Sequence, residues 1–172
     1  MKIVRYLLLF VCFSCATINV EYDYDRTVDF HEYSTYNYYS DLDTGLSELD
    51  SRRLLNIFDE VMASKGMKLS ADPDFFVNIS SFEYDDPSGG TVGVGVGGTG
   101  RNVGGGITVG LPVQGSRYSR QIRFDFIDEN GRGLFWQAVS ESKFHPDASP
   151  EAREMNLRAI IDKVLIAYPP QK

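Results

Sequence analysis

The sequence predicts a single α+β domain in which an antiparallel β-sheet carries two amphipathic helices on one face. Three observations lead to this prediction. Apolar and polar residues alternate in several segments, most regularly in residues 120–144, which is typical of half-buried strands. Two segments, one after Ser47 and one after Ser149, repeat apolar residues with the period of a helix. The elements follow the order β-β-α-β-(glycine-rich β)-β-β-α, which favours one sheet with the helices layered on it.

Residues 120–144 are predicted to form the central hairpin. A two-residue loop would pair Phe126 with Phe135, which lies on the wrong face of its own strand. A three-residue loop, with Gly131 in the left-handed conformation, keeps one apolar face, so we expect a hairpin with a G1 bulge. The only tryptophan, Trp136, is interpreted as a core anchor rather than a ligand platform. The expected pairs are Phe126 with Leu134, Phe124 with Trp136, and Ile122 with Ala138.

Residues 1–14 have the features of a cleaved export signal. A short basic start is followed by an apolar run, residues 6–13, that is too short to cross a bilayer as a helix. Ser14 directly before Cys15 looks like a lipobox, the site at which bacterial lipoproteins are diacylated and cut, although Cys12 stands at the usual leucine position. The prediction is therefore cleavage between Ser14 and Cys15, lipidation of Cys15, and a mature domain of residues 15–172. The alternative is an ordinary secretory signal with an incidental cysteine.

The charge balance and the residues after Cys15 predict where the domain resides. Removal of Lys2 and Arg5 with the signal leaves 15 basic against 24 acidic residues, a net charge of −9. Such a surface is repelled by nucleic acid and by anionic lipid heads, so membrane attachment has to come from the lipid. Ala16 and Thr17 give no acidic signal directly after Cys15, which favours the outer membrane, facing the periplasm.

The other elements are predicted from caps, turns and periodicity. Six of the ten tyrosines lie between Tyr22 and Tyr39, and they are interpreted as sheet packing rather than as a row that stacks on sugars. The expected elements are strands at 18–25 and 35–39, a helix from Ser47 to the C′ residue Gly66, a strand at 75–84, and a helix from Ser149 that ends before Pro169.

Residues 89–115 contain 12 of the 16 glycines. The run Gly93-x-Gly95-x-x-Gly98 matches the dinucleotide fingerprint, but no helical pattern follows until Ser149, so the match is compositional. Valine and glycine alternate in this segment, which predicts an irregular or long hairpin with a bare glycine face. Such an edge favours pairing with another chain, and the alternative is a flexible loop without a partner. The predicted interaction surface comprises Gly93, Gly95, Gly97, Arg101 and Asn102.

The sequence offers no recognisable catalytic constellation. His31 and His145 are the only histidines, and neither has metal-ligand spacing to a carboxylate. No nucleophile elbow is present, and the acidic pairs in residues 41–43 and 85–86 lie in loop-like contexts. We therefore predict a protein that is not an enzyme and has no cofactor, no metal site and no catalytic residue.

With these motifs placed, the chain resembles the bacterial lipoprotein family known as domain of unknown function 4136. The resemblance implies a single α+β domain in the envelope, and it carries over no catalytic residue because the family has no assigned activity. It rests on short motifs in a fixed order: residues 22–25, Asp29-Phe30, residues 33–36, Arg52-Arg53, residues 65–67 and 72–78, the glycine-rich insertion, residues 124–128 and 135–138, and Tyr168-Pro169-Pro170.

Two classes of function follow from these predictions. The first is a non-enzymatic binding or assembly module at the membrane, which uses the glycine-rich segment to bind a protein partner or a second copy. The alternative is a small-ligand carrier or hydrolase with a pocket between the sheet and the helices. Converging carboxylates in such a pocket would favour this alternative, whereas a filled interface and an exposed edge would favour the module.

Overall fold

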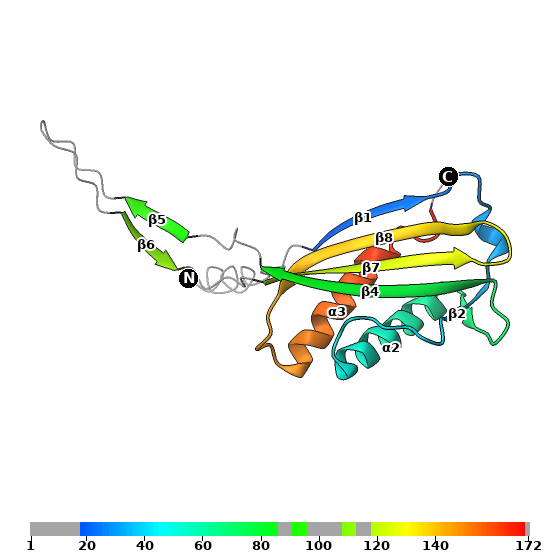
Figure 1. Ribbon diagram of the computed structural model, residues 1–172, viewed down its shortest axis with the longest axis horizontal. Coiled ribbons are helices and arrows are strands. Elements are labelled where there is room, and N and C mark those ends of the chain that lie inside the picture. The colour runs from blue at the N-terminus through cyan, green and yellow to red at the C-terminus, as the bar shows by residue number, and fades with distance from the viewer. Residues whose placement is uncertain (1–17, 86–90, 96–107, 113–117, 171–172) are drawn as a thin grey trace, which may run out of the picture.

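The computed structural model describes residues 18–85 and 118–170, together with the backbone of 91–95 and 108–112. The α+β fold predicted from the sequence is confirmed, with both helices on the same side of the large sheet (Figure 1). In chain order the elements are β1 (Asn19–Tyr24), a short 3-10 helix (Phe30–Glu32), β2 (Thr35–Tyr38), α2 (Glu48–Ser64), β3 (Lys68–Leu69), β4 (Phe75–Asp85), β5 (Thr91–Gly95), β6 (Thr108–Pro112), β7 (Tyr118–Asp128), β8 (Gly133–Phe144) and α3 (Pro150–Leu165).

The large sheet has six strands in the order β1-β8-β7-β4-β2-β3. Its β1–β8, β8–β7 and β7–β4 pairs are antiparallel, as expected, but β2 runs parallel to both β4 and β3. The prediction of a wholly antiparallel sheet is therefore wrong at this edge. The reason is that α2 lies between β2 and β4 in the chain, and a helical crossover returns the chain to the end of the sheet from which it started.

Both helices begin at the predicted caps, and α2 ends at the predicted glycine. The Ser47 hydroxyl accepts the N–H of Asp50 at 3.3 Å, and the Ser149 hydroxyl accepts the N–H of Ala152 at 3.3 Å. Each bond satisfies one of the backbone donors that the first turn of a helix leaves open. Gly66 follows α2 with a φ of 85°, a left-handed conformation that favours glycine.

The core lies between the sheet and the two helices. From α2 it receives Leu54, Ile57 and Phe58, and from α3 it receives the predicted stripe that begins at Leu157. Tyr168 belongs to this core, but it lies beyond the end of α3 rather than on the helix. Large aromatic side chains supply most of the apolar area in such a layer. Those that are almost fully buried are Tyr36, Phe58, Phe75, Phe124, Phe126, Phe135 and Trp136.

The β7–β8 hairpin differs from its predicted register. Trp136 lies opposite Phe126 rather than Phe124, and Leu134, expected in the core, pairs with Ile127 and is 52% exposed. Asp128 pairs with Gly133, so the loop is residues 129–132, one residue longer than predicted. The predicted pairs Phe126–Leu134, Phe124–Trp136 and Ile122–Ala138 are therefore wrong.

A bulge in β8, together with the longer loop, accounts for this difference. The register shifts between Phe126 and Ile127, which leaves Phe135 as an additional residue in β8. A bulge interrupts strict alternation, and here it turns Phe135 and Trp136 inward together, each only 1% exposed. The left-handed residue of the turn is Gly133, with a φ of 72°, and the prediction that Gly131 has this role is wrong.

Strands β5 and β6 form a separate two-stranded antiparallel sheet, called here the arm. The β4–β7 ladder reaches the pair Asp85–Tyr118, and the arm contains the pairs from Thr91–Pro112 to Gly95–Thr108. The two residue numbers of every pair have the same sum in both ladders. The arm thus keeps the register of the β4–β7 hairpin and confirms the predicted hairpin for these residues (Figure 1).

Candidate functional site

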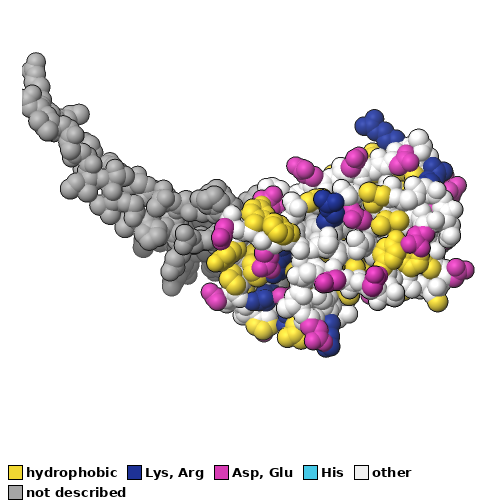
Figure 2. Space-filling view, viewed as in Figure 1, with side chains coloured by type: hydrophobic (Ala, Val, Ile, Leu, Met, Phe, Trp, Pro, Cys, Tyr) yellow, Lys and Arg dark blue, Asp and Glu magenta, His cyan; other side chains and the backbone are white. Residues whose placement is uncertain are grey.

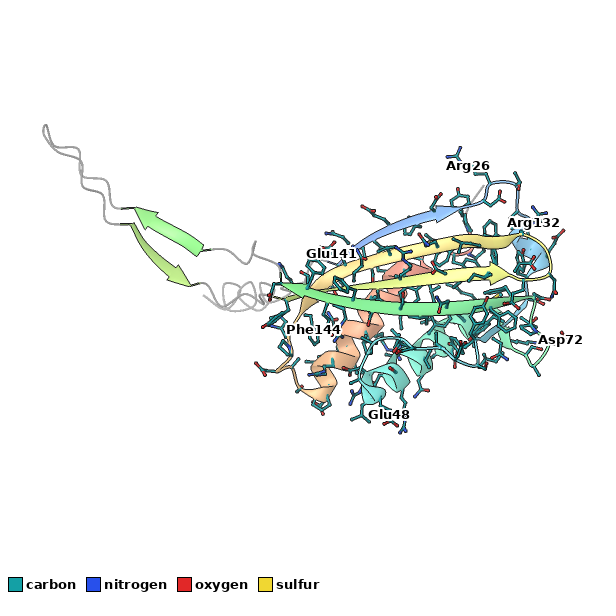
Figure 3. The ribbon with its side chains drawn as sticks, viewed as in Figure 1. Arg26, Glu48, Asp72, Arg132, Glu141 and Phe144 are labelled. Atoms are coloured by element: carbon teal, nitrogen blue, oxygen red, sulfur yellow. The ribbon has the colours of Figure 1, made fainter. Side chains whose placement is uncertain are left out.

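The arm departs from one end of the six-stranded sheet, between Asp85 and Tyr118, and we call this the arm end. Figure 3 shows Phe144 at this end, close to the start of α3, whereas Asp72 and Arg132 lie at the opposite end. Two features lie at the arm end: a pocket on the helix side of the sheet, and an exposed aromatic pair on the other side. They are the candidate functional surfaces.

The pocket has a volume of about 400 Å³ and lies between the ends of β7 and β8 and the first turns of α3. It exists because α3 changes the size of the side chains that it turns toward the sheet. From Leu157 onward these side chains are bulky and fill the core. The earlier helix positions Ala152 and Asn156 line the pocket instead, together with Ala148 from the loop before α3. The short side chains leave a space between helix and sheet.

Arg120 forms the most deeply buried charge in the pocket walls, with a side chain that is 8% exposed. Its guanidinium carbon lies 3.7 Å from the centre of the Phe144 ring, which is a cation–π contact. Glu83 lies directly opposite Arg120 on β4, and one of its carboxylate oxygens accepts the Nε and Nη2 hydrogens at 3.0 and 2.6 Å. The bonds to Glu83 and the ring contact hold the guanidinium in place.

Arg153 fixes the opposite side of the pocket. It donates from Nη1 to Asp50 of α2 at 2.8 Å, from Nε to the carbonyl of Ala148 at 3.1 Å, and from Nη2 to the carbonyl of Pro146. The other oxygen of Asp50 accepts from Arg53 at 2.7 Å. This ion triad ties α2, α3 and the loop at 145–148 together, so Arg153 shapes the pocket wall.

The electrostatics of Asp50 follow from this triad. Burial of the carboxylate raises its pKa, and the hydrogen bonds from Arg153 and Arg53 lower it by more, so the pKa of Asp50 lies below its usual value. The carboxylate side chain is only 2% exposed, while the two arginine side chains are 26% and 23% exposed. Asp50 is thus a buried anion compensated by two partly buried cations.

The face of the sheet opposite the helices carries an exposed aromatic pair. The rings of Phe82 and Tyr84 are 6.1 Å apart and nearly parallel, and Phe82 is 65% exposed. The Tyr84 hydroxyl donates to Glu141 on β8 at 2.6 Å. Figure 2 shows patches of hydrophobic side chains toward both ends of the folded body and acidic side chains spread over the visible face.

Most of the tyrosines in residues 33–39 pack as predicted. The hydroxyls of Tyr36 and Tyr38 both donate to one oxygen of Asp59, at 2.7 and 2.6 Å, and Tyr33 donates to Asp128 at 3.0 Å. Burial, together with the bond to Asp128, raises the pKa of Tyr33 to about 12. These bonds therefore secure β2 to α2, and the segment before β2 to the end of β7.

The residues predicted from the sequence to form sites have different positions. Gly93 and Gly95 lie in β5, while Ser14, Cys15, Gly97, Arg101 and Asn102 lie outside the described residues. His31 is exposed, and His145 is exposed at the pocket rim. Within the described ranges, no group of three or more histidine, cysteine or acidic side chains is arranged to hold a metal ion. In the same residues, no helix has the length and apolar character needed to cross a membrane.

Sequence reasoning missed the pocket, although two signals for it are present. Arg120 has the same parity as the buried residues Ile122 and Phe124, and Glu83 has the same parity as the buried Ile79. Two opposite charges at core positions of neighbouring strands indicate a buried ion pair. The second signal is Ala152, which lies one turn before the bulky stripe of α3 and marks where the helix stops filling the core.

The fold is similar to that of three solved structures, all with low sequence identity. A PDZ domain protein from Parabacteroides distasonis ATCC 8503 has a TM-score of 0.60 at 15% identity; the match covers 98% of this chain, which spans 40% of that protein. The PelC dodecamer from Paraburkholderia phytofirmans has a TM-score of 0.51 at 9% identity, with 91% of this chain and 100% of that chain covered. No curated protein matches the sequence.

The third structure is a DUF4136 family protein from Bacteroides thetaiotaomicron VPI-5482, with a TM-score of 0.50 and 16% identity over 88% of this chain and 96% of that one. The family model described as "Domain of unknown function (DUF4136)" matches residues 20–170. This match covers β1, both helices and the last strand of the sheet, so it includes the whole fold. The chain therefore belongs to the DUF4136 family.

Proposed function

We propose that this protein is a lipid-anchored component of the cell envelope that faces the periplasm and acts as a non-enzymatic binding or assembly module. The anchor is Cys15, which precedes β1 by only a few residues, so the domain would lie close to the membrane surface. The excess of acidic residues does not favour adsorption to anionic lipid heads, so the attachment would depend on the lipid. The outer membrane is the proposed location.

The observation that carries the assembly function is the register shared by the arm and the β4–β7 hairpin. In the arm, the apolar pairs Val92–Leu111 and Val94–Val109 flank the glycine pair Gly93–Gly110. A two-stranded sheet with an apolar side is marginally stable on its own, and glycine lets another backbone approach closely. Both properties favour a binding partner, either another protein or a second copy of this chain.

Two further points support a binding module. The space between the helices and most of the sheet is filled by the core residues described above. The pocket at the arm end has one carboxylate in its described walls, Asp147, so those walls hold no pair of acids of the kind that a glycoside hydrolase uses. PelC, which has the same fold, is a dodecamer, so this fold is compatible with oligomerisation.

Cys15→Ala is expected to abolish lipid attachment. Without the thiol no diacylglycerol can be transferred, and the signal segment should stay uncleaved or the protein should lose its anchor. Mass spectrometry of the isolated protein and fractionation of membranes from soluble material measure the outcome. Cys12→Ala is the control and should leave lipidation intact. Diacylglycerol mass on the Cys15→Ala protein would refute the anchor.

Replacement of residues 86–117 with an Asn-Gly turn should preserve most of the thermal stability while removing any association that the full chain shows. Asp85 and Tyr118 are paired across the β4–β7 ladder, so a short turn can join them. Loop closure depends only weakly on length, and the core receives no described residue from the arm. Thermal melts and analytical ultracentrifugation are the measurements.

A second variant separates the role of the glycines from the presence of the arm. Gly93→Val with Gly110→Val keeps a hairpin of residues that favour strands, but adds side chains to the glycine pair. It should fold as the wild type does and lose association. If association survives in both variants, the arm is not the binding surface. If the turn variant fails to fold, residues 86–117 contribute to the core.

A further inference from the structure

The pocket at the arm end has the size and the lining of a small-molecule site. Pockets that bind organic ligands have volumes of roughly 300–1,000 Å³ and combine apolar walls with a few placed polar groups. This pocket, at about 400 Å³, has the ring of Phe144 and the methyl groups of Ala148 and Ala152 as apolar walls. An apolar body of modest size fits such walls, because burial against a ring and methyl groups removes its surface from water.

The charges in the walls favour an anion. Among the described residues, Arg120, Lys143 and Arg153 line the pocket against a single acid, Asp147, and His145 adds a fourth basic side chain at the rim. The whole chain has a net charge of −7, so this concentration of basic groups runs against its overall composition. Glu83 and Asp50 neutralise part of this charge, but their ion pairs also hold the two guanidinium groups in fixed positions.

Arg120 is the group positioned to bind the head of a ligand. A guanidinium has five N–H groups, and the bonds to Glu83 use Nε–H and one hydrogen of Nη2. Among the described residues the remaining hydrogens, including both on Nη1, have no hydrogen-bond partner. A planar guanidinium whose rotation is restricted by Phe144 matches the two oxygens of a carboxylate or phosphate. Arg153 has a different role, because its three nitrogens already bind Asp50, Ala148 and Pro146.

From these observations we infer that the pocket binds a small amphipathic oxyanion, a molecule with a carboxylate or phosphate head and an apolar or aromatic body. The head lies against Arg120, and the body lies between Phe144 and the two alanines, Ala148 and Ala152. This site is separate from the arm and does not depend on the proposed assembly function. It gives the domain an oxyanionic ligand in addition to the proposed protein partner.

The test uses the full-length protein in nanodiscs of zwitterionic phosphatidylcholine, with phenylacetate and benzyl phosphate as probes. Phenethylammonium has a similar body with a positive head, and acetate has the head without the ring. Isothermal titration calorimetry should detect saturable binding of at least one anionic probe, at least ten times tighter than phenethylammonium or acetate. Chemical-shift changes should centre on Phe144 and Ala152. No saturable binding of either anionic probe, or equal binding of phenethylammonium, would overturn the inference.

Three variants assign the binding to the pocket. Arg120→Gln should lower the affinity for the anionic probe by about ten- to a hundred-fold, the range expected for loss of a charged hydrogen bond. Ala152→Leu should abolish detectable binding by filling the space from α3, where leucine is a good helix former. Arg158→Gln is the matched control, because Arg158 is an exposed arginine on α3, the helix of Ala152, and it pairs with Glu60 outside the pocket. If the Arg120→Gln protein does not fold, the Ala152→Leu protein still tests the site. Unchanged binding of the anionic probe to the Ala152→Leu protein would refute the pocket as the binding site.

A final experiment distinguishes a free ligand from a lipid head group. Anionic phosphatidylglycerol is added to the nanodiscs while phenylacetate is titrated. Displacement of phenylacetate would assign the oxyanion to the bilayer surface, and undiminished binding would assign it to a soluble molecule. If phosphatidylglycerol displaces phenylacetate equally from the Ala152→Leu protein, phenylacetate binds outside the pocket, and this result would count against the inference.

Discussion

Replacing Trp136 with alanine is expected to lower the free energy of unfolding by about 3–5 kcal/mol. The indole is 1% exposed, and its ring lies 4.5 Å from that of Phe126 and 5.3 Å from that of Tyr168. Removing it leaves a cavity against residues of β7 and the segment after α3, which cannot all move inward together. Urea or guanidinium denaturation, followed by far-ultraviolet circular dichroism, measures the change.

Leu134→Ala is the matched control, because it tests the register of the hairpin. In a three-residue loop Leu134 and Trp136 would both face the core, whereas the bulge leaves Leu134 52% exposed. The expected cost of Leu134→Ala is within about 0.5 kcal/mol, as for other surface positions. A loss as large as that of Trp136→Ala would mean that the bulge at Phe135 is absent.

Replacing Asp50 with alanine should lower the free energy of unfolding by about 3 kcal/mol, near the low end of the range for breaking a buried ion pair. The two arginine side chains would keep their positive charges beside an apolar core without a counter-charge, although their partial exposure moderates the cost. The Ser47 cap of α2 is not removed by this change, because it uses the backbone N–H of residue 50. The effect should therefore come from the triad.

The pH dependence gives an independent test of the same triad. The pKa of Asp50 is lower in the folded state, so its contribution to stability is fully present above the unfolded value, about 3.9, and is lost as the pH falls through the folded value. The stability difference between the wild type and Asp50→Ala should consequently narrow in acid. A stability difference that stays constant down to pH values well below the pKa of aspartate in the unfolded chain would contradict the pairing.

Glu60→Ala is the matched control for Asp50→Ala, since Glu60 also lies on α2 and pairs with an arginine of α3. The Glu60–Arg158 pair is exposed, at 66% and 41% for the two side chains. Exposed pairs contribute about 0–1 kcal/mol because water screens them and the long side chains lose entropy. Equal losses in the two variants would indicate that burial of Asp50 is not what makes its pair important.

Local features of the sequence were sufficient to predict the two helices and the longer strands, but not the 3-10 helix or the two-residue strand β3. Ser47 and Ser149 begin the two helices, and Gly66 follows the first, because a cap depends on residues within one turn of it. The strands around Phe75 and Ile122 follow from alternation, since side chains in a strand point to opposite faces in turn. The order of these short motifs also indicated the family, which the match over residues 20–170 confirms.

The tertiary structure decided what depends on residues far apart in the chain. Whether Trp136 pairs with Phe124 or Phe126 depends on a bulge that buries Phe135 and Trp136 together, a gain that exists only once the helices cover that face. The parallel pairing of β2 with β4 results from the return of the chain through α2. The pocket follows the same principle. Arg120 is a charged residue at a core position of β7, and Ala152 is a small residue just before the bulky stripe of α3. They line the same pocket because the sheet extends past the bulky part of α3.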